Sequence, residues 1–348
     1  MESVAGFFKG IRNFFVLSDK ILILLSIAAS AYGMLLIASA TNTFSSDRNF
    51  NVQLFAIFIG LVMMLIISKI DYSFFSNISK LLFLFGTAMI ILTILIGVGP
   101  PGTDNKNWIK LGSFNLQFSE FYKIIFVITF GTHLSNLGEN INDIKKVLAL
   151  TIHGMFYVGM VAIQGDIGSA LVFLCMFNIM IFSAGLKLRY FVAEILVAVL
   201  ASPFIWQYFL KEYMRNRILA GFNPELFPSG AGYQAIQSKI AIGSGGFWGK
   251  GLFNGTQIQY DLLPFKHTDF IFAVAGEELG FIGAMLVLGV LLAIIFRVLY
   301  VSQVAKDRVG HFFCIGILSI IVVQTFENIG MCLGMLPDRK STRLNSSH

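Results

Sequence analysis

The stretch TDFIFAVAGEELGFIGAMLVLGVLLAIIF, residues 268–296, decides the fold. After Thr268 and Asp269 the run is apolar, except for the neighbouring carboxylates Glu277 and Glu278. A helix that crosses a membrane needs about 20 mainly apolar residues, and this run is longer. It therefore predicts a membrane-spanning helix that carries acidic residues in an unusual place.

The composition of the whole chain agrees with a membrane protein. Of its 348 residues, 56% are hydrophobic and 13% are charged, whereas soluble domains carry about 25% charged residues. The mean hydropathy is +0.77. The net charge of +6 comes from basic residues scattered between apolar runs, which argues against a nucleic-acid-binding protein. The three cysteines lie in apolar runs and predict buried side chains, with neither a disulfide nor a metal site.

Nine apolar segments are long enough to span a membrane, which predicts an all-α integral membrane protein built as a polytopic helix bundle. They cover about 21–41, 52–70, 81–99, 118–137, 147–164, 167–186, 190–210, 268–296 and 310–336. Residues 1–18 combine Phe with Lys9 and Arg12, a pattern typical of an amphipathic helix at the membrane surface.

The basic residues of the short loops set the expected orientation. With the N-terminus in the cytoplasm, twelve Lys and Arg fall on the inner side and three on the outer side, as the positive-inside rule requires. The long loop 211–267, between the seventh and eighth spans, then lies outside the cell, and a loop of this length is usually functional. Its segment AIGSGGFWGKGLFNGTQ (241–257) is rich in glycine, so its backbone can pack against another surface or bind an anion.

Polar residues near the ends of other spans are candidates for a site. Glu120 and Lys123 are three residues apart, so they share a helix face. The pair either orients its helix at the interface or faces a cavity. Asp166 lies in the turn between the fifth and sixth spans, where Asp is an ordinary helix cap.

The residues alone favour a capping role for Asp269. Thr268 is a good N-cap residue, and the helix dipole favours a carboxylate in the first turn. Glu277 and Glu278 lie about 12–14 Å further along the helix, where carboxylates usually face a cavity or a partner. Four basic residues of the long loop could contact a phosphate-bearing substrate, although solvation is the simpler interpretation of each one: Arg217, Lys239, Lys250 and Lys266.

Five segments in a fixed order resemble a known family. They are WIKLGSFNLQFSEFYKI, GDIGSALVF, GYQAIQSKIAIGSGGFWGKGLFNGTQ, LPFKHTDFIFAVAGEELGFIGA and NIGMCLGMLP, between about 108 and 337. Together they resemble the SEDS family (shape, elongation, division and sporulation), whose members include RodA, FtsW and SpoVE. The residues NGTQ ahead of HTDF are more similar to the RodA elongation branch.

The resemblance implies a ten-helix membrane fold and peptidoglycan glycosyltransferase activity. Members of the family polymerise lipid II into glycan strands on the outer face of the bacterial cytoplasmic membrane. It also implies a role in cell elongation, with a class B penicillin-binding protein as the partner. On the family's motifs, Asp269 corresponds to the catalytic carboxylate, and Glu120 with Lys123 to a membrane-embedded ion pair.

The chain departs from the family pattern at several places. Phe118 stands where the family has Pro, Asn107 stands where it commonly has Arg, and the usual Pro-Asp-Leu-Gly is Gly-Asp-Ile-Gly at 165–168. The family also continues beyond residue 337 with a further segment and a tenth helix. Residues 338–348 are therefore predicted to be a truncation or an artefact that follows a single transmembrane domain, 1–337.

The resulting hypothesis makes Asp269 the general base that activates an acceptor hydroxyl. His267 and Lys266 are predicted helpers, and a divalent cation such as Mg or Mn would offset the charge of a pyrophosphate. A groove near the fourth and eighth spans would hold the lipid tail. Two alternatives stay open: a flippase or transporter of lipid-linked precursors, and a non-catalytic scaffold for a penicillin-binding protein. The predicted pyrophosphate contacts are Arg217, Lys239 and Lys250.

Overall fold

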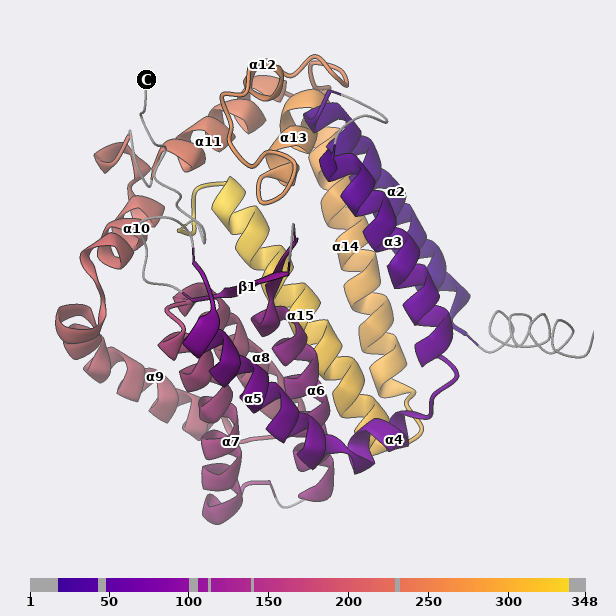
Figure 1. Cartoon of the computed structure of the whole chain (residues 1–348), viewed down its shortest axis with the longest axis vertical. Coiled ribbons are helices and arrows are strands. Elements are labelled where there is room, and N and C mark those ends of the chain that lie inside the picture. Colours follow the sequence, from indigo (N-terminus) through magenta and orange to yellow (C-terminus); the bar gives the residue numbers. More distant parts are fainter. Residues whose placement is uncertain are drawn as a thin grey trace, which may run out of the picture. The chain divides into compact units, whose positions relative to one another are not determined.

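The computed structural model describes residues 18–42, 48–99, 106–111, 114–138, 141–228 and 232–337. The predicted amphipathic helix within 1–18 and the tail 338–348 lie almost wholly or wholly outside these residues. Apart from one short hairpin, the regular structure of the described residues is helical (Figure 1). The described residues belong to two compact units, and the expected single domain 1–337 stays a prediction.

The first unit comprises the described residues within Met1–Asp71, Gly221–Val298 and Glu327–Leu336. It holds α2 (Lys20–Ala40), α3 (Arg48–Ile67), α11 (Tyr233–Gly245), α12 (Thr256–Gln259), α13 (Ile271–Glu278) and most of α14 (Gly280–Gln303). A short 3-10 helix, Pro224–Leu226, also belongs to it.

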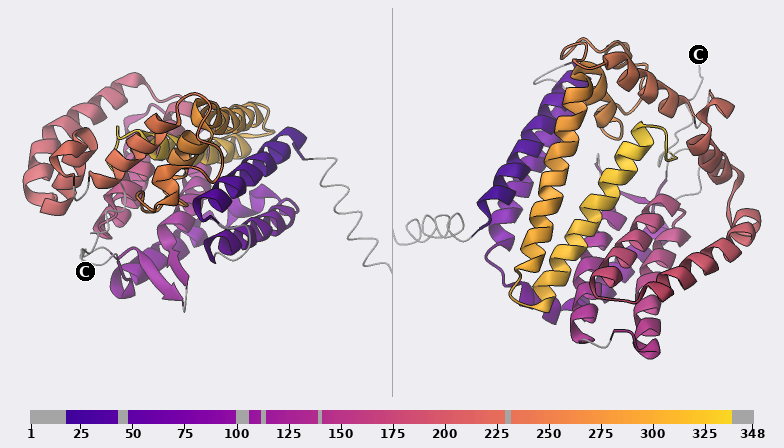
Figure 2. Two further views of the ribbon diagram at one scale, coloured as in Figure 1. Left: turned by 90° about the horizontal axis from the view of Figure 1, so that it is seen from above. Right: turned by 180° about the vertical axis from the view of Figure 1, so that it is seen from behind.

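Helices α2, α3 and α14 run side by side (Figures 1 and 2). Two polar contacts join α2 to α14: the Tyr32 hydroxyl donates to the Gly283 carbonyl at 3.1 Å, and Arg297 forms an ion pair with Asp19 at 2.8 Å. Asp19 also caps α2, because its Oδ1 accepts from the Leu22 N–H at 2.9 Å. None of the residues of α3 is buried, as expected of a helix whose surface faces lipid.

The second unit comprises the described residues within Tyr72–Ala220, Leu299–Phe326 and Pro337–His348. It holds α4 (Tyr72–Asn77), α5 (Ser79–Ile96), α6 (Phe118–Asn136), α7 (Ile144–Ile163), α8 (Ile167–Ser183), α9 (Leu188–Phe204), a π-helix (Ile205–Phe209) and most of α10 (Glu212–Phe222) and α15 (Arg308–Cys332). Strands β1 (Trp108–Leu111) and β2 (Phe114–Gln117) pair as an antiparallel hairpin immediately before α6.

Aromatic side chains form the core of the second unit. The rings of Tyr122 and Tyr157 lie 4.4 Å apart, and Phe126 and Phe173 pack around them. The hydroxyls of Thr129 and Tyr157 are 2.7 Å apart, so the buried phenol has a hydrogen-bond partner. This core joins α6, α7 and α8 into one bundle.

The expected polytopic helical membrane protein is confirmed. Seven described helices are long and apolar enough to cross a membrane: Lys20–Ala40, Arg48–Ile67, Ser79–Ile96, Ile144–Ile163, Leu188–Phe209, Gly280–Gln303 and Arg308–Cys332. The other two predicted spans, 118–137 and 167–186, correspond to α6 and to the shorter apolar helix α8.

Two segments differ from their sequence-based description. The connection 211–267, treated as a loop, contains α10, a 3-10 turn, α11 and α12. The predicted single span 268–296 is two helices, α13 and α14, which meet at Leu279. Hydropathy alone did not show this break, because it follows from one left-handed residue, Gly280 (φ +67°), and from backbone contacts with a distant segment.

Candidate functional site

Asp269 lies in a tight turn that precedes α13. The carbonyl of Phe265 accepts hydrogen bonds from the N–H groups of Thr268 at 3.0 Å and Phe270 at 3.3 Å. The predicted capping by Thr268 is wrong, because α13 begins at Ile271, its N-cap residue is Phe270, and no side chain caps it. The Thr268 hydroxyl instead donates to the Phe265 carbonyl at 3.2 Å. The simple interpretation of this stretch as a capping sequence therefore loses its support.

The end of α15 holds the backbone of Asp269. Nδ2 of Asn328 donates to the Asp269 carbonyl at 2.8 Å, and the Cys332 thiol lies 3.7 Å from the same oxygen. Asp269 itself is half-buried. Neither Asn328 nor Cys332 was identified as a site residue, although both lie in the segment NIGMCLGMLP that carries part of the family resemblance.

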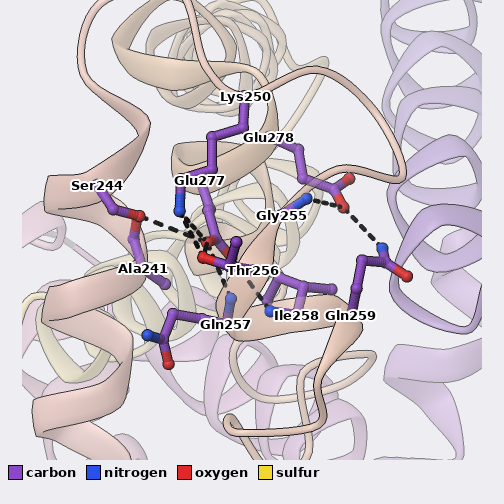
Figure 3. A network of polar contacts seen from close by, with 10 residues as sticks. All are labelled: Ala241, Ser244, Lys250, Gly255, Thr256, Gln257, Ile258, Gln259, Glu277 and Glu278. Carbon is purple, nitrogen blue, oxygen red and sulfur yellow. Dashed lines mark hydrogen bonds and ion pairs between the residues drawn. The ribbon is translucent and has the colours of Figure 1, made fainter.

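Glu277 and Glu278 are the last two residues of α13, and both are fully buried. Instead of a cavity, the Glu277 carboxylate faces the segment 250–258 (Figure 3). Its Oε1 forms an ion pair with Lys250 Nζ at 2.7 Å and accepts hydrogen bonds from the Thr256 hydroxyl at 3.1 Å and the Gln257 N–H at 3.0 Å. Its Oε2 accepts from the Ile258 N–H at 3.2 Å.

Glu278 contacts different groups of the same segment and of α2. Its Oε1 accepts from Gln259 Nε2 at 3.0 Å and lies 3.4 Å from the Gly255 N–H (Figure 3). Its Oε2 accepts from the hydroxyl of Ser39, which in turn accepts from the Phe253 N–H at 2.8 Å. The two glutamates are therefore anchors for the glycine-rich segment, which explains how acidic residues persist within an apolar run.

The glycines of this segment allow backbones to approach closely. A Cβ on Gly245 would lie 2.0 Å from the Gly276 carbonyl oxygen, and one on Gly249 would lie 2.2 Å from the Glu278 carbonyl oxygen. The N–H groups of Lys250 and Gly251 donate to the carbonyls of Glu277 and Glu278 at 3.0 and 2.8 Å. Of the two predicted roles for this segment, close packing against another surface is the one that these contacts describe.

Two lysines that were considered as possible substrate contacts have partners within the protein. Lys250 is bound to Glu277, and its ammonium also donates to the Thr256 hydroxyl at 2.7 Å. Lys266 Nζ donates to the Ile258 carbonyl and forms an ion pair with Asp261 at 2.6 Å. These contacts give both ammonium groups partners within the protein, so neither lysine needs a ligand to account for its position.

The remaining predicted site residues are distributed over both units. Lys239 is exposed on α11, and its Cε would lie 2.2 Å from a Cβ on Gly334, so the side chain packs against that glycine. His267 is half-buried in the turn ahead of Asp269. Arg217 lies on α10, in the part of that helix that belongs to the second unit. The structure therefore places Lys239, His267 and Asp269 in the first unit and Arg217 in the second.

Glu120 and Lys123 form the predicted ion pair in the second unit. Lys123 Nζ is 2.7 Å from Glu120 Oε2, with the lysine side chain 2% exposed and the glutamate side chain 47% exposed. Beside them lies an almost wholly apolar groove of about 400 Å³ between α5 and α6. Its lining includes Phe118 and Phe121, which flank Glu120 in the sequence, and Gly86 on α5.

Asp166 is a helix cap, as expected. Its Oδ1 accepts from the Ser169 N–H at 3.0 Å at the start of α8. Its Oδ2 accepts from the Ser169 hydroxyl at 2.8 Å and from Gln117 Nε2 at 3.0 Å, which links α8 to the hairpin. The described residues contain no group of three or more His, Cys, Asp or Glu side chains that could hold a metal ion.

A family model described as cell cycle protein, which covers FtsW, RodA and SpoVE, matches residues 19–339 of this chain. The chain belongs to this family. Stage V sporulation protein E of Bacillus subtilis is 32% identical over 326 residues, which cover 92% of this chain and 88% of that protein. Peptidoglycan glycosyltransferase MrdB of Escherichia coli is 33% identical over 320 residues, with 92% and 85% covered.

Other family members bear on the branch and the fold. A probable peptidoglycan glycosyltransferase FtsW of Trichlorobacter lovleyi is 32% identical over 330 residues, with 92% and 85% covered. Relatives of different branches are thus equally similar, and the assignment to the RodA branch stays a prediction. A solved chain from a peptidoglycan synthase complex has the same fold, with TM-score 0.79, 22% identity, and 93% and 90% of the two chains covered. RodA of Thermus thermophilus matches with TM-score 0.66, 20% identity, and 93% and 90% covered.

Proposed function

We propose that this family member is a peptidoglycan glycosyltransferase that polymerises lipid II at the outer face of the bacterial cytoplasmic membrane. The main structural support is the position of Asp269, which lies in a turn just before α13 and whose backbone carbonyl accepts a hydrogen bond from Asn328. Relatives that are 32–33% identical over most of their length bear the name peptidoglycan glycosyltransferase. A role in cell elongation is part of the proposal.

The proposed step is a substitution at an anomeric carbon. The acceptor hydroxyl oxygen forms the new glycosidic bond, while the bond between the anomeric carbon and the pyrophosphate oxygen breaks and the lipid pyrophosphate leaves. Asp269 takes the proton of the acceptor hydroxyl as this bond forms, because a hydroxyl is a weak nucleophile until it loses its proton. The fixed backbone on either side of Asp269 gives the carboxylate a defined position, which general-base catalysis needs.

The groove between α5 and α6 supports a lipid-linked substrate. Its apolar walls and its volume of about 400 Å³ suit a branched hydrocarbon chain. Glu120, whose carboxylate is half-exposed and pairs with Lys123, lies on α6 between two residues that line the groove, Phe118 and Phe121. The groove is proposed to hold part of the polyprenyl tail.

The orientation and the partner complete the proposal. The distribution of basic residues favours an N-terminus in the cytoplasm and Asp269 at the outer side. A class B penicillin-binding protein is the proposed partner, because a related chain of the same fold was solved within a complex described as coordinating polymerization and crosslinking.

The chain's own residues carry each step above. Among the described residues, no group of three or more His, Cys, Asp or Glu side chains could hold a resident metal ion. Basic side chains at the outer side would offset the pyrophosphate charge, and of these Lys239 is exposed. The expected divalent cation stays a prediction that a titration with EDTA tests.

The deciding experiment uses purified protein, with and without its partner, and fluorescently labelled lipid II. Asp269→Ala and the isosteric Asp269→Asn are compared with Glu225→Gln, which removes an exposed carboxylate from the same connection. We expect glycan polymer from the unchanged protein and from Glu225→Gln, and a loss of at least 100-fold with both Asp269 variants. A fully active Asp269→Ala protein would remove Asp269 from the mechanism.

The alternatives give different outcomes in the same preparation. A lipid II flippase would move labelled lipid II across liposome membranes and produce no polymer. A non-catalytic scaffold would do neither, yet it would bind the penicillin-binding protein and raise its activity. Either result would replace the glycosyltransferase proposal.

A further inference from the structure

We propose that Glu277 is a positioning residue, and that its ion pair with Lys250 fixes the turn that carries Asp269. The inference rests on the proposed function only for its catalytic consequence, since the mechanical link can be tested alone. The link has three parts: the clamp at Glu277, a relay through Ile258, and the strained turn that ends at Asp269.

The clamp is the carboxylate of Glu277 with the donors that surround it. Oε1 accepts from Lys250 Nζ at 2.7 Å, from the Gln257 N–H at 3.0 Å and from the Thr256 hydroxyl at 3.1 Å. Oε2 accepts from the Ile258 N–H at 3.2 Å. The Glu277 side chain is fully buried, and that of Lys250 is 26% exposed. Charged hydrogen bonds in such surroundings are about twice as strong as neutral ones, so the clamp holds the segment 250–258 firmly against α13.

Ile258 transmits this position to the Asp269 turn. Its N–H donates to Glu277, while its carbonyl accepts from Lys266 Nζ. Its side chain is fully buried, so the residue has little freedom to move between its two partners. Lys266 is three residues from Asp269 and directly follows Phe265, whose carbonyl organises the turn. One buried residue therefore connects the clamp to the turn.

The turn needs such support because its backbone is strained. Phe265, the first residue of the turn, has φ +56°, in the left-handed region that residues other than glycine rarely adopt. Asp261, which precedes the turn and pairs with Lys266, has φ +54°. Conformations of this kind cost about 1–3 kcal/mol each and persist only where the surroundings hold them. A weaker clamp is therefore expected to let the turn relax and to displace the Asp269 carboxylate.

The test measures amide hydrogen exchange and kinetics together. Lys250→Met removes the cation, and Lys250→Met with Glu277→Gln removes both charges. Thr256→Val removes one hydroxyl, which donates to Glu277 at 3.1 Å and accepts from Lys250 Nζ at 2.7 Å. It leaves both charges in place and serves if the stronger variants do not fold. Lys250→Arg is the conservative variant, and Glu225→Gln is the matched control.

We expect Lys250→Met to speed exchange of the turn's amides, Thr268 and Phe270, at least tenfold. We expect kcat to fall on the order of 10- to 100-fold, with KM within about twofold of its original value. In Lys250→Arg and in the charge-free double variant, we expect part of the exchange protection and part of kcat to be restored. Thr256→Val should shift exchange and kcat in the same direction by a smaller factor.

Three results would overturn the inference. Unchanged exchange of Thr268 and Phe270 in a folded Lys250→Met protein would show that the clamp and the turn are independent. Faster exchange with an unchanged kcat would show that the turn's position does not matter for catalysis. A parallel rise in KM would assign Lys250 to substrate binding. If Asp269→Ala polymerises normally while the exchange coupling holds, the proposed function fails and the mechanical link stands.

Discussion

The amide of Asn328, near the end of α15, donates from Nδ2 to the backbone carbonyl of Asp269 at 2.8 Å. The two residues are 59 positions apart in the chain, and the contact joins the segment NIGM to the segment HTDF. Two of the family-like segments thus meet at one hydrogen bond. The bond fixes the peptide that carries the proposed base, without using the carboxylate itself.

Asn328→Leu should lower polymerisation more than it lowers stability. The substitution keeps the size of the side chain but leaves the Asp269 carbonyl without this donor, which costs about 1–3 kcal/mol for a buried group and less for a half-buried one. We expect kcat to fall about tenfold or more, measured with labelled lipid II beside a thermal unfolding curve. Asn142→Leu removes an amide contact of the same kind to the Gly185 carbonyl at 3.2 Å in the other unit. It should cost stability but leave kcat unchanged; equal losses of kcat in both variants would contradict the assignment.

Two glycines of α11 should respond in opposite ways to alanine. A Cβ at Gly245 would lie 2.0 Å from the Gly276 carbonyl oxygen, whereas one at Gly243 would meet nothing within 4 Å. Gly243→Ala should stabilise the protein by up to about 1 kcal/mol, because alanine is the better helix former. Gly245→Ala should destabilise it by about 2 kcal/mol or more, since α11 and α13 must separate. Thermal unfolding in detergent compares the two variants. Similar melting temperatures would mean that the fold does not need the close approach of Gly245 to Gly276.

Much of the fold was predictable because hydropathy depends on the residues of each segment alone. The predicted spans 21–41 and 52–70 correspond to α2 and α3 within a few residues. The break between α13 and α14 was not predictable in this way, because it depends on contacts from residues more than 20 positions away. Gly251 donates to the Glu278 carbonyl, and Phe281 donates to the Gly246 carbonyl.

The same distinction between local and distant contacts applies to the residues of the candidate site. Asp166 was correctly interpreted as a cap, because capping depends on residues within one turn. Lys250 and Lys266 were considered as possible substrate contacts, because the sequence does not show that Lys250 pairs with Glu277 or that Lys266 contacts the Ile258 carbonyl. The three-residue spacing of Glu120 and Lys123 within one helix did predict their ion pair. No such local spacing relates Lys250 to Glu277, so their ion pair could not be predicted in this way.

The ion pair between Asp19 and Arg297 predicts a dependence of stability on pH. The hydrogen bond from Arg297, with smaller help from the Leu22 N–H and the Arg297 charge, holds the Asp19 pKa below its ordinary value of 3.8. Because the folded-state pKa is lowered, the pair's contribution is complete above about pH 4 and is lost as the pH falls through the folded-state value. Asp19→Asn keeps a good N-cap residue and removes only the charge.

Asp19→Asn should therefore lower stability at neutral pH by no more than about 1 kcal/mol, as for other pairs that solvent partly screens. The difference from the unchanged protein should shrink below pH 4, because protonated Asp19 resembles Asn. Melting temperatures in detergent between pH 3 and 7 measure this difference. Arg297→Gln provides the complementary variant and should show the same trend. A difference that is constant over the whole range would mean that the carboxylate charge contributes nothing.

The pair Glu120 and Lys123 should be asymmetric towards substitution, because only the lysine side chain is buried. Glu120→Gln leaves the Lys123 ammonium without its carboxylate in a site that is 2% exposed; breaking a buried pair in this way costs about 3–5 kcal/mol. Lys123→Met fills the same space and leaves Glu120, which is 47% exposed, in contact with solvent or headgroups. That variant should therefore cost about 1 kcal/mol or less.

The double variant Glu120→Gln with Lys123→Met tests the physical reason for this asymmetry. If the loss in Glu120→Gln comes from an unpaired buried cation, removing the cation should restore most of the stability. Thermal unfolding of the three variants gives the coupling between the residues directly. Polymerisation by the double variant then separates the two interpretations of the pair. An active and stable double variant would make the pair a structural element of α6, whereas a stable but inactive one would place its charges in the chemistry beside the groove. Equal stability losses in the two single variants would show that burial of Lys123 does not control the pair.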